Sequence, residues 1–202
     1  MNNSSQEFYW INRAVPWSCF APLKVGDTTE TGNGFNPYFS FFLNHAEKIN
    51  VQIENEGQKD FLAVRFLELV RDNLVSCPQL AQVSHRIAAH FVKLIGELLW
   101  EQVRKEEFPD LPSRQRCIFL NEDRSRVPYW IERLDCPSRC QVLRIHATGR
   151  FHRADERLLI GDGYTLAQAW DRARAYWRGQ VQDGLGNEIL FEGKITVLEI
   201  IA

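Results

Sequence analysis

Residues 187–201, Asn-Glu-Ile-Leu-Phe-Glu-Gly-Lys-Ile-Thr-Val-Leu-Glu-Ile-Ile, are the stretch that decides the fold. Their β-branched and aromatic side chains favour extended structure, and Glu192-Gly193 in the middle is a tight-turn signal. The stretch therefore predicts two strands, residues 188–191 and 194–201, that meet as a hairpin. Glu188 opens the first of these strands.

A helix and a further strand pair are predicted upstream of this hairpin. Residues 165–177 carry apolar residues at helical spacing, and Thr165 has a side chain suited to the N-cap. Residues 141–146 and 150–154 are predicted as strands that pair through a turn at Thr148-Gly149. The C-terminal half is therefore expected to consist of short strands and one amphipathic helix.

Shorter elements are predicted towards the N-terminus. The aromatic residues of segment 7–12 favour a first strand, and residues 116–120 favour another. Residues 122–134 are predicted as a short helix with Pro128 in its first turn. The apolar run at residues 38–43 fits either a strand or the start of a helix.

Two amphipathic helices are predicted between Gln58 and Phe108. Cys77-Pro78 separates them, and the prolines at positions 109 and 112 end the second helix. Their apolar residues recur at spacings of three and four, which places them on one face. These residues are Leu62, Phe66, Leu69, Val70 and Leu74, then Leu80, Val83, Ile87, Phe91, Leu94, Ile95, Leu98 and Val103. The expected fold class is a single α+β domain, residues 1–202, with a helical insertion at about 58–107.

The composition limits the classes of partner and compartment. A net charge of −2 gives no general attraction to nucleic acid or to an anionic membrane, so neither is an expected partner. Five cysteines without a paired framework fit a reducing cytosol. Residues 1–7 lack a secretory pattern, and no apolar stretch reaches the roughly 18 residues of a membrane span. A cytoplasmic protein is expected, in its own cell or in a target cell.

Common catalytic and metal-binding motifs are missing from the sequence. Cys136 and Cys140 are followed by His146 and His152, but a second close pair with zinc-ligand spacing is absent. The sequence contains no GxxxxGK[ST] loop, no GxGxxG after a strand and no GxSxG elbow. No metal is therefore expected, and the common hydrolase and nucleotide-binding motifs do not explain the chain.

Two segments, taken in order, carry a resemblance to a known superfamily. The first is Leu-Pro-Ser-Arg-Gln-Arg-Cys-Ile-Phe-Leu at residues 111–120, followed by an acidic turn and a helix containing Tyr129-Trp130. The second is the stretch 187–197. With the early aromatic strand, this order resembles the ADP-ribosyltransferase superfamily, and it is similar to a bacterial group of ADP-ribosyltransferase-like proteins. The resemblance extends over residues 101–130 and 140–200.

The resemblance implies a split β-sheet core that binds NAD as a substrate, without a metal. Glu188 matches the late catalytic glutamate of the superfamily. Tyr9 and Trp10 occupy the place of the early NAD-gripping residues, and Trp10 replaces a residue that is usually polar. Ser113 and Arg114 would lie at the mouth of the cleft, where an arginine can pair with a pyrophosphate. Cys117 falls where a serine is common.

The chemistry explains why a carboxylate is wanted at the late position. Breaking the nicotinamide–ribose bond develops positive charge on the sugar, and a fixed carboxylate beside it lowers the barrier. The expected function is a mono-ADP-ribosyltransferase that modifies an unidentified macromolecular acceptor, in the manner of a bacterial toxin or effector. Transferases that modify arginine carry Glu or Gln two residues before the catalytic Glu. Gly186 stands there, so arginine specificity is not supported.

Other interpretations stay open at this point. The chain could be an NAD glycohydrolase, with water as acceptor, or a binding module that retains the fold without the chemistry. It could also be an interaction or immunity protein built around a helix at residues 79–107. Charged residues assigned to the exposed face of that helix (His85, Arg86, Lys93, Glu97, Glu101 and Arg104) favour solvent over a partner there. Glu188 could be a solvated edge residue, and Arg114 a surface ion pair of little energy.

Overall fold

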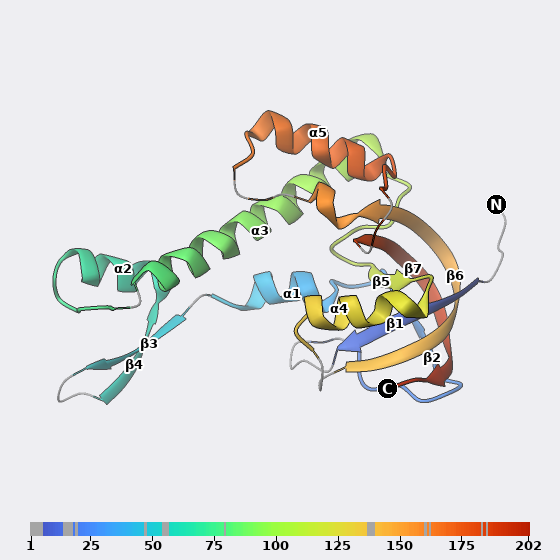
Figure 1. Ribbon diagram of the computed structural model, residues 1–202, viewed down its shortest axis with the longest axis horizontal. Coiled ribbons are helices and arrows are strands. Elements are labelled where there is room, and N and C mark those ends of the chain that lie inside the picture. The colour runs from blue at the N-terminus through green and yellow to red at the C-terminus, as the bar shows by residue number, and fades with distance from the viewer. Residues whose placement is uncertain are drawn as a thin grey trace.

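The computed structural model has a mixed α+β fold, as the sequence predicts (Figure 1). It describes residues 6–13, 18, 20–46, 48–53, 57–78, 80–136, 140–159, 161, 163–182, 184 and 186–202. The strands are β1 (Gln6–Arg13), β2 (Thr28–Glu30), β3 (Lys48–Ile53), β4 (Gly57–Leu62), β5 (Ile118–Asn121), β6 (Cys140–Asp155) and β7 (Asn187–Ile200). The helices are α1 (Pro37–Asn44), α2 (Ala63–Arg71), α3 (Leu80–Glu107), α4 (Val127–Arg133) and α5 (Leu166–Trp177), with short 3-10 turns η1 (Arg124–Arg126) and η2 (Glu156–Leu158).

Four strands of the main sheet close into a ring. The strand order is β2-β7-β5-β1-β6, and β6 pairs with β7 as well as with β1. The pairings between these strands are antiparallel. The long strands β6 and β7 curve strongly to complete this ring, as Figure 1 shows.

Alternation of side chains along the strands divides the apolar residues between the two faces of the sheet. The inner face is filled by Phe8, Trp10, Ile118, Leu120, Leu143, Ile145, Ala147, Ile189, Phe191, Ile195 and Val197, which form one buried cluster. The outer face is covered by helices. Leu190, from the outer face of β7, packs with Trp100 of α3 and Trp177 of α5, while Ile11 of β1 packs near Val127 of α4.

The predicted hairpins at Thr148-Gly149 and Glu192-Gly193 are wrong. Both segments continue as single strands, β6 and β7, and the register places Gly149 opposite Gly193. A Cβ atom added to Gly149 would lie 2.8 Å from the Gly193 Cα, and Gly193 has a φ of +145°. The glycines therefore allow two continuous strands to approach closely, which is a different reason for glycine from a turn.

The predicted helical insertion is correct only in part. Residues 57–62 form β4 instead of the start of a helix, and β3 pairs with β4 as a two-stranded hairpin. The sequence pattern missed this hairpin because the described side chains of β4 are exposed or half-buried, so they show no apolar face. With α2 and the first half of α3, the hairpin projects as an arm from the closed sheet (Figure 1).

The exposed face of α3 is also different from the prediction. Glu97 and Glu101, expected in solvent, are 5% and 4% exposed, while Phe91, Ile95 and Leu98 are about half exposed. The apolar face buried in the second half of α3 is formed by Leu99, Trp100 and Val103. The assignment failed because the helix packs against two different neighbours along its length, α2 and α5.

Several local predictions are confirmed. The early aromatic segment forms β1, and residues 38–43 lie in α1. α4 has a proline in its first turn, and α5 begins with Thr165 and Gln168 in a capping box. Among the described helices, none is long and apolar enough to cross a membrane.

Candidate functional site

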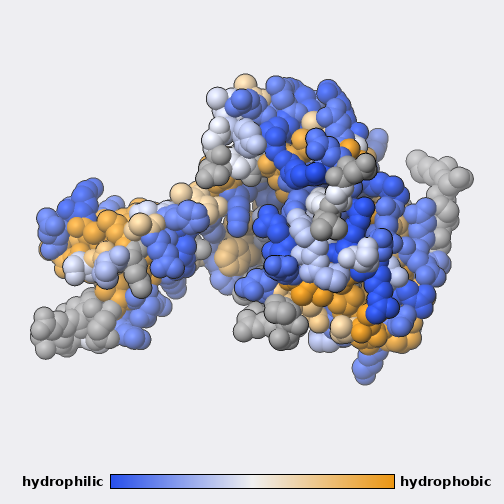
Figure 2. Space-filling model, in the orientation of Figure 1, coloured by the Kyte–Doolittle hydropathy of each residue, from blue (hydrophilic) through white to orange (hydrophobic). Residues whose placement is uncertain are grey.

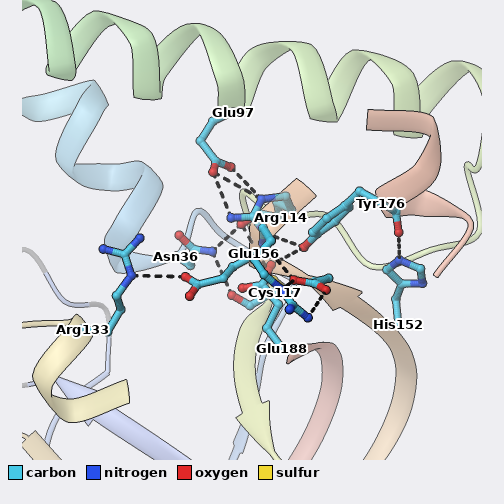
Figure 3. Close-up of polar contacts among 11 residues, drawn as sticks. Asn36, Glu97, Arg114, Cys117, Arg133, His152, Glu156, Tyr176 and Glu188 are labelled. Carbon is cyan, nitrogen blue, oxygen red and sulfur yellow. Dashed lines mark hydrogen bonds and ion pairs between the residues drawn. The ribbon is translucent and has the colours of Figure 1, made fainter. Parts of the chain in front are cut away.

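A buried group of charges lies where α3, α5, β7 and the loop before β5 meet (Figure 3). Arg114, from the loop, stands at its centre. Its Nη2 donates to Glu97 Oε1 of α3 at 3.0 Å, and its Nη1 donates to Glu188 Oε1 of β7 at 2.5 Å. The Tyr176 hydroxyl of α5 donates to the same Glu188 oxygen at 2.6 Å. We call Glu97, Arg114, Tyr176 and Glu188 the charge cluster.

The loop that carries Arg114 is held by α1. Asn36, the N-cap of α1, accepts from the Phe39 backbone and donates through Nδ2 to the Arg114 and Cys117 carbonyl oxygens at 2.7 and 2.9 Å. The loop also closes on itself, since the Cys117 backbone N–H donates to the Ser113 carbonyl oxygen. These bonds fix the backbone of Arg114 before its side chain meets the two carboxylates.

The charge cluster holds two carboxylates and one guanidinium away from water. Its four residues are between 0 and 6% exposed. Burial raises the pKa of Glu188 above the ordinary value of a glutamate, and Arg114 and Tyr176 oppose that rise. Burial likewise raises the pKa of Tyr176 well above that of a free tyrosine. A buried charge is tolerated only when it is paired and hydrogen-bonded, which is the role that Arg114 fills here.

A second polar group lies next to the charge cluster along α3 and β7. Ser113 Oγ donates to Glu101 Oε2 at 2.9 Å, and the Ser113 backbone N–H donates to Glu192 Oε1 at 2.9 Å. Arg104 pairs with Glu101, and Arg150 pairs with Glu192. Ser113 therefore fastens the loop to both neighbours from a position that is only 5% exposed.

Residues of α1, α4 and η2 border the charge cluster. Burial raises the pKa of Tyr38 on α1, and the Glu97 carboxylate raises it further. Figure 3 shows Arg133 of α4 facing Glu156, to which it donates at 3.3 Å. Tyr129 also donates to Glu156. A Cβ added to Gly186 would lie 3.1 Å from the Glu156 side chain, so Glu156 fills the space that a side chain at position 186 would take.

The predicted site residues are brought together only in part. Glu188 and Arg114 are in direct contact, and Ser113 lies beside them. Arg114 is buried, so the prediction of an arginine at the mouth of a cleft is wrong, as is the alternative of a surface ion pair. Cys117 is fully buried in the core between α3 and α5, where burial raises the pKa of its thiol well above the ordinary value.

The early pair, Tyr9 and Trp10, is divided between the two faces of β1. Trp10 lies in the inner cluster, edge-on to Phe20, on the face opposite Glu188. Tyr9 lies on the same face as Glu188, and its β5 partner is Asn121. Because Leu120 pairs with Ile189, the register sets Asn121 beside Glu188. Tyr9 therefore lies two strand spacings from Glu188, about 10 Å.

Asn121 is a residue that the sequence did not point to. It is 6% exposed, and its Oδ1 has no hydrogen-bond partner among the residues that the structure describes. A buried acceptor without a partner is unusual, and it is satisfied when a ligand or water supplies a donor. Its place between Tyr9 and Glu188 makes it a candidate for contact with a ligand.

Glu97 and Tyr176 were also missed by the sequence. The Tyr176 ring lies in the core with Trp177, but its hydroxyl joins the charge cluster. Glu97 follows Gly96 in an apolar part of the predicted helix, and a glycine inside a helical pattern was the one sequence signal that the glutamate could face the protein interior.

A separate open groove lies behind Tyr176. It has a volume of about 700 Å³ and runs between the C-terminal ends of α3 and α5 and the second half of β6. His152 lies at its base, where its Nε2–H donates to the Tyr176 carbonyl oxygen at 2.9 Å. Tyr176 is thus linked through its backbone carbonyl to His152, which lines the groove, and through its hydroxyl to the charge cluster. No group of three or more metal-binding side chains occurs in the described part of the chain.

Comparison with other proteins identifies a family whose description names no function. The curated proteins contain no match to the sequence. A family described as "Protein of unknown function (DUF2441)" matches residues 8–202, which include the charge cluster, Asn121 and Tyr9. Since this match covers nearly the whole chain, the protein belongs to the DUF2441 family.

Proposed function

We propose that this protein is an NAD-consuming enzyme, a mono-ADP-ribosyltransferase in which Glu188 is the catalytic carboxylate. The observation that carries the proposal is the setting of Glu188. It lies at the start of β7, it is 6% exposed, and Arg114 and Tyr176 both donate to one of its two oxygens, Oε1. A solvated edge residue would have neither this burial nor these partners. The split-sheet core of the superfamily is part of the same proposal.

The chemistry assigns a role to each oxygen of Glu188. Cleavage of the nicotinamide–ribose bond leaves positive charge on the sugar, and nicotinamide departs with the bonding electrons. Oε1 is held by Arg114 and Tyr176, so Oε2 is the oxygen that meets the sugar and its 2′-hydroxyl. A carboxylate that is already oriented in a dry site stabilises such a charge without reorganising.

Asn121 fits the leaving group. A primary carboxamide donates through its N–H groups, and Asn121 Oδ1 is a buried acceptor that lacks a donor among the described residues. Because Asn121 lies between Tyr9 and Glu188, it would hold the nicotinamide next to the sugar that Glu188 faces. Tyr9 is the ring on the same side of the sheet.

Arg114 and Arg133 have different roles in the proposed site. The donors of Arg114 are directed at Glu97, Tyr176 and Glu188, so Arg114 positions the carboxylate. Arg133 has a side chain that is 62% exposed and faces Glu156 at the edge of the site. It is therefore the better candidate to contact the pyrophosphate of NAD.

The test is release of nicotinamide from NAD, followed by chromatography. The protein is expected to release nicotinamide, and Glu188→Gln is expected to lower the rate at least about 100-fold, the scale of losing an electrostatic stabiliser. Glu199→Gln is the matched control, because Glu199 is an exposed glutamate on the same strand. No release by the wild-type protein, or equal rates for both variants, would overturn the proposal.

A hydrolase and a binding module remain the alternatives. If nicotinamide is released and no macromolecule becomes labelled, water is the acceptor and the protein is an NAD glycohydrolase. The binding module is favoured by Trp10, which is buried on the face opposite Glu188. It predicts a thermal shift with NAD and no cleavage.

A further inference from the structure

α3 carries a regular exposed stripe that the site does not use. Ala81, Ser84, Ala88, Phe91, Ile95 and Leu98 are all exposed, at alternating spacings of three and four residues. The three large side chains among them are 48, 54 and 51% exposed. We call these six residues the α3 seam. It runs along the part of α3 that leaves the closed sheet and enters the arm (Figure 1), and Figure 2 shows hydrophobic residues on the arm.

The spacing is that of a coiled-coil contact. Positions 81, 88 and 95 take the place of a in a heptad, and positions 84, 91 and 98 take the place of d. A helix that needed only solvent on this side would have no reason to keep apolar residues on so narrow a strip. α2 and α5 pack against α3, and the apolar side chains that the helix buries, Val83, Leu99, Trp100 and Val103, do not belong to the seam.

The sizes of the side chains indicate the partner. The N-terminal half of the seam is small (Ala81, Ser84 and Ala88), and the C-terminal half is large. If a second α3 lies antiparallel across a two-fold axis between Ala89 and His90, every small residue faces a large one. Ala81 then faces Leu98, Ser84 faces Ile95, and Ala88 faces Phe91 of the second copy.

We propose that the α3 seam is a homodimer interface in which two copies of this chain pack their α3 helices antiparallel. A two-fold interface requires one surface to be complementary to itself, and the alternation of small and large residues about one point meets that requirement. In a parallel pair, large residues would meet large ones and small would meet small, which leaves gaps at one end.

The area is sufficient for a weak, reversible dimer. The 18 residues from Ala81 to Leu98 span about 27 Å of helix. Half of the lateral surface of a helix of this length and roughly 12 Å across is on the order of 500 Å² in each copy, so two copies together bury about 1,000 Å², the lower limit for a specific interface. Glu97 points away from the seam into the charge cluster, so the dimer leaves that cluster intact. The inference does not rest on the proposed function.

Sedimentation velocity on the full chain tests the proposal. Between about 1 µM and about 100 µM, the range for an interface of this size, the wild-type protein should pass from monomer to dimer. Ile95→Lys should weaken the dimer at least about 100-fold, because the charge enters the seam twice. Val25→Lys is the matched control, since Val25 is 61% exposed and lies outside α3. It should dimerise like the wild type.

A charge-pair variant tests the antiparallel register. Ser84→Glu combined with Ile95→Lys should recover part of the dimer, because these positions face each other only in the antiparallel arrangement. Circular dichroism verifies that each variant is folded, and Leu98→Lys replaces Ile95→Lys if the latter unfolds. Three results would each overturn the proposal. They are a wild-type protein that is monomeric at every concentration, a dimer that the seam variants Ile95→Lys and Leu98→Lys leave unaffected, and a charge-pair variant that recovers no dimer.

Discussion

Arg114 and Glu188 are 74 residues apart in the sequence, yet Nη1 of the first lies 2.5 Å from Oε1 of the second. Both side chains are almost fully buried, and Glu97 holds the other side of the guanidinium. The contact joins the loop before β5 to the start of β7 and to α3. It is therefore both a part of the fold and the centre of the proposed site.

Arg114→Ala is expected to reduce the free energy of unfolding by about 3–5 kcal/mol, because two buried carboxylates lose their common partner. Urea unfolding measures this loss. Arg144→Ala is the control: Arg144 also pairs with two glutamates, Glu7 and Glu199, but on the surface, where such pairs contribute about 1 kcal/mol or less. Equal losses for the two variants would contradict a buried charge cluster.

Tyr176→Phe should move the acidic limb of nicotinamide release to higher pH. The Tyr176 hydroxyl donates to Glu188 and lowers the pKa that burial raises, so its removal raises the pKa of Glu188 further. The ionised carboxylate, and with it the activity, then appears only at higher pH. A rate–pH profile checks this, with Tyr164→Phe, an exposed tyrosine, as control. A lower rate with an unchanged profile would mean that Tyr176 does not position Glu188.

His152 should make the fold less stable in mild acid. Burial lowers the pKa of His152 below 6.5, so the folded state binds a proton less readily than the unfolded state. The contribution of neutral His152 to the free energy of unfolding is complete above about pH 6.5. It is lost as the pH falls through the lower pKa that His152 has in the folded state. In the variant His152→Gln, the loss of stability over this range should be reduced. Thermal unfolding from neutral to mildly acidic pH measures it, and identical slopes for wild type and variant would be the contrary result.

Asn121→Leu separates binding from stability. Its Oδ1 is buried without a described partner, so an apolar side chain of similar size should leave the stability unchanged or raise it slightly. Under the proposed function, the same variant should raise KM for NAD by roughly tenfold, the energy of one hydrogen bond. Asn50→Leu, on the exposed hairpin of the arm, is the control. A clear loss of stability with unchanged KM would assign Asn121 to the fold alone.

Gly149→Ala should destabilise the closed sheet by about 1–3 kcal/mol, because the added methyl group enters a filled space. The new Cβ would lie 2.8 Å from the Gly193 Cα and closer still to the Glu192 carbonyl oxygen. Gly34→Ala is the control, since a Cβ there would meet nothing within 4 Å. Chemical unfolding of the two variants compares a glycine that permits close approach with one that does not.

Sequence patterns predicted correctly those helices and strands that are determined by residues within the element itself. The helical spacing and the Thr165 cap placed α5, and the aromatic run placed β1. The glycines at positions 149 and 193 were misinterpreted as turn residues. A turn and a close approach of two paired strands both require glycine, so the residue type alone does not distinguish them. Only the pairing of β6 with β7, which brings residues 149 and 193 together, distinguishes the two.

Only part of the candidate site could be predicted from the sequence. Glu188 and Arg114 stood out because they belong to ordered motifs, whereas Glu97 appears on an amphipathic helix among other charged residues. A glutamate in such a helix is normally solvated. Its burial depends on an arginine that arrives from a loop 17 residues further on, and helical periodicity contains no information about that contact.

The closure of β1, β5, β7 and β6 has a consequence for how this protein recognises others. Where a strand is paired on both sides, as β7 is between β5 and β6 at residues 189–191, it cannot accept an extended peptide as a new neighbour. A macromolecule that approaches such a doubly paired segment must be selected by side chains on helices and loops. Substitutions there should change partner choice while the ring itself remains intact.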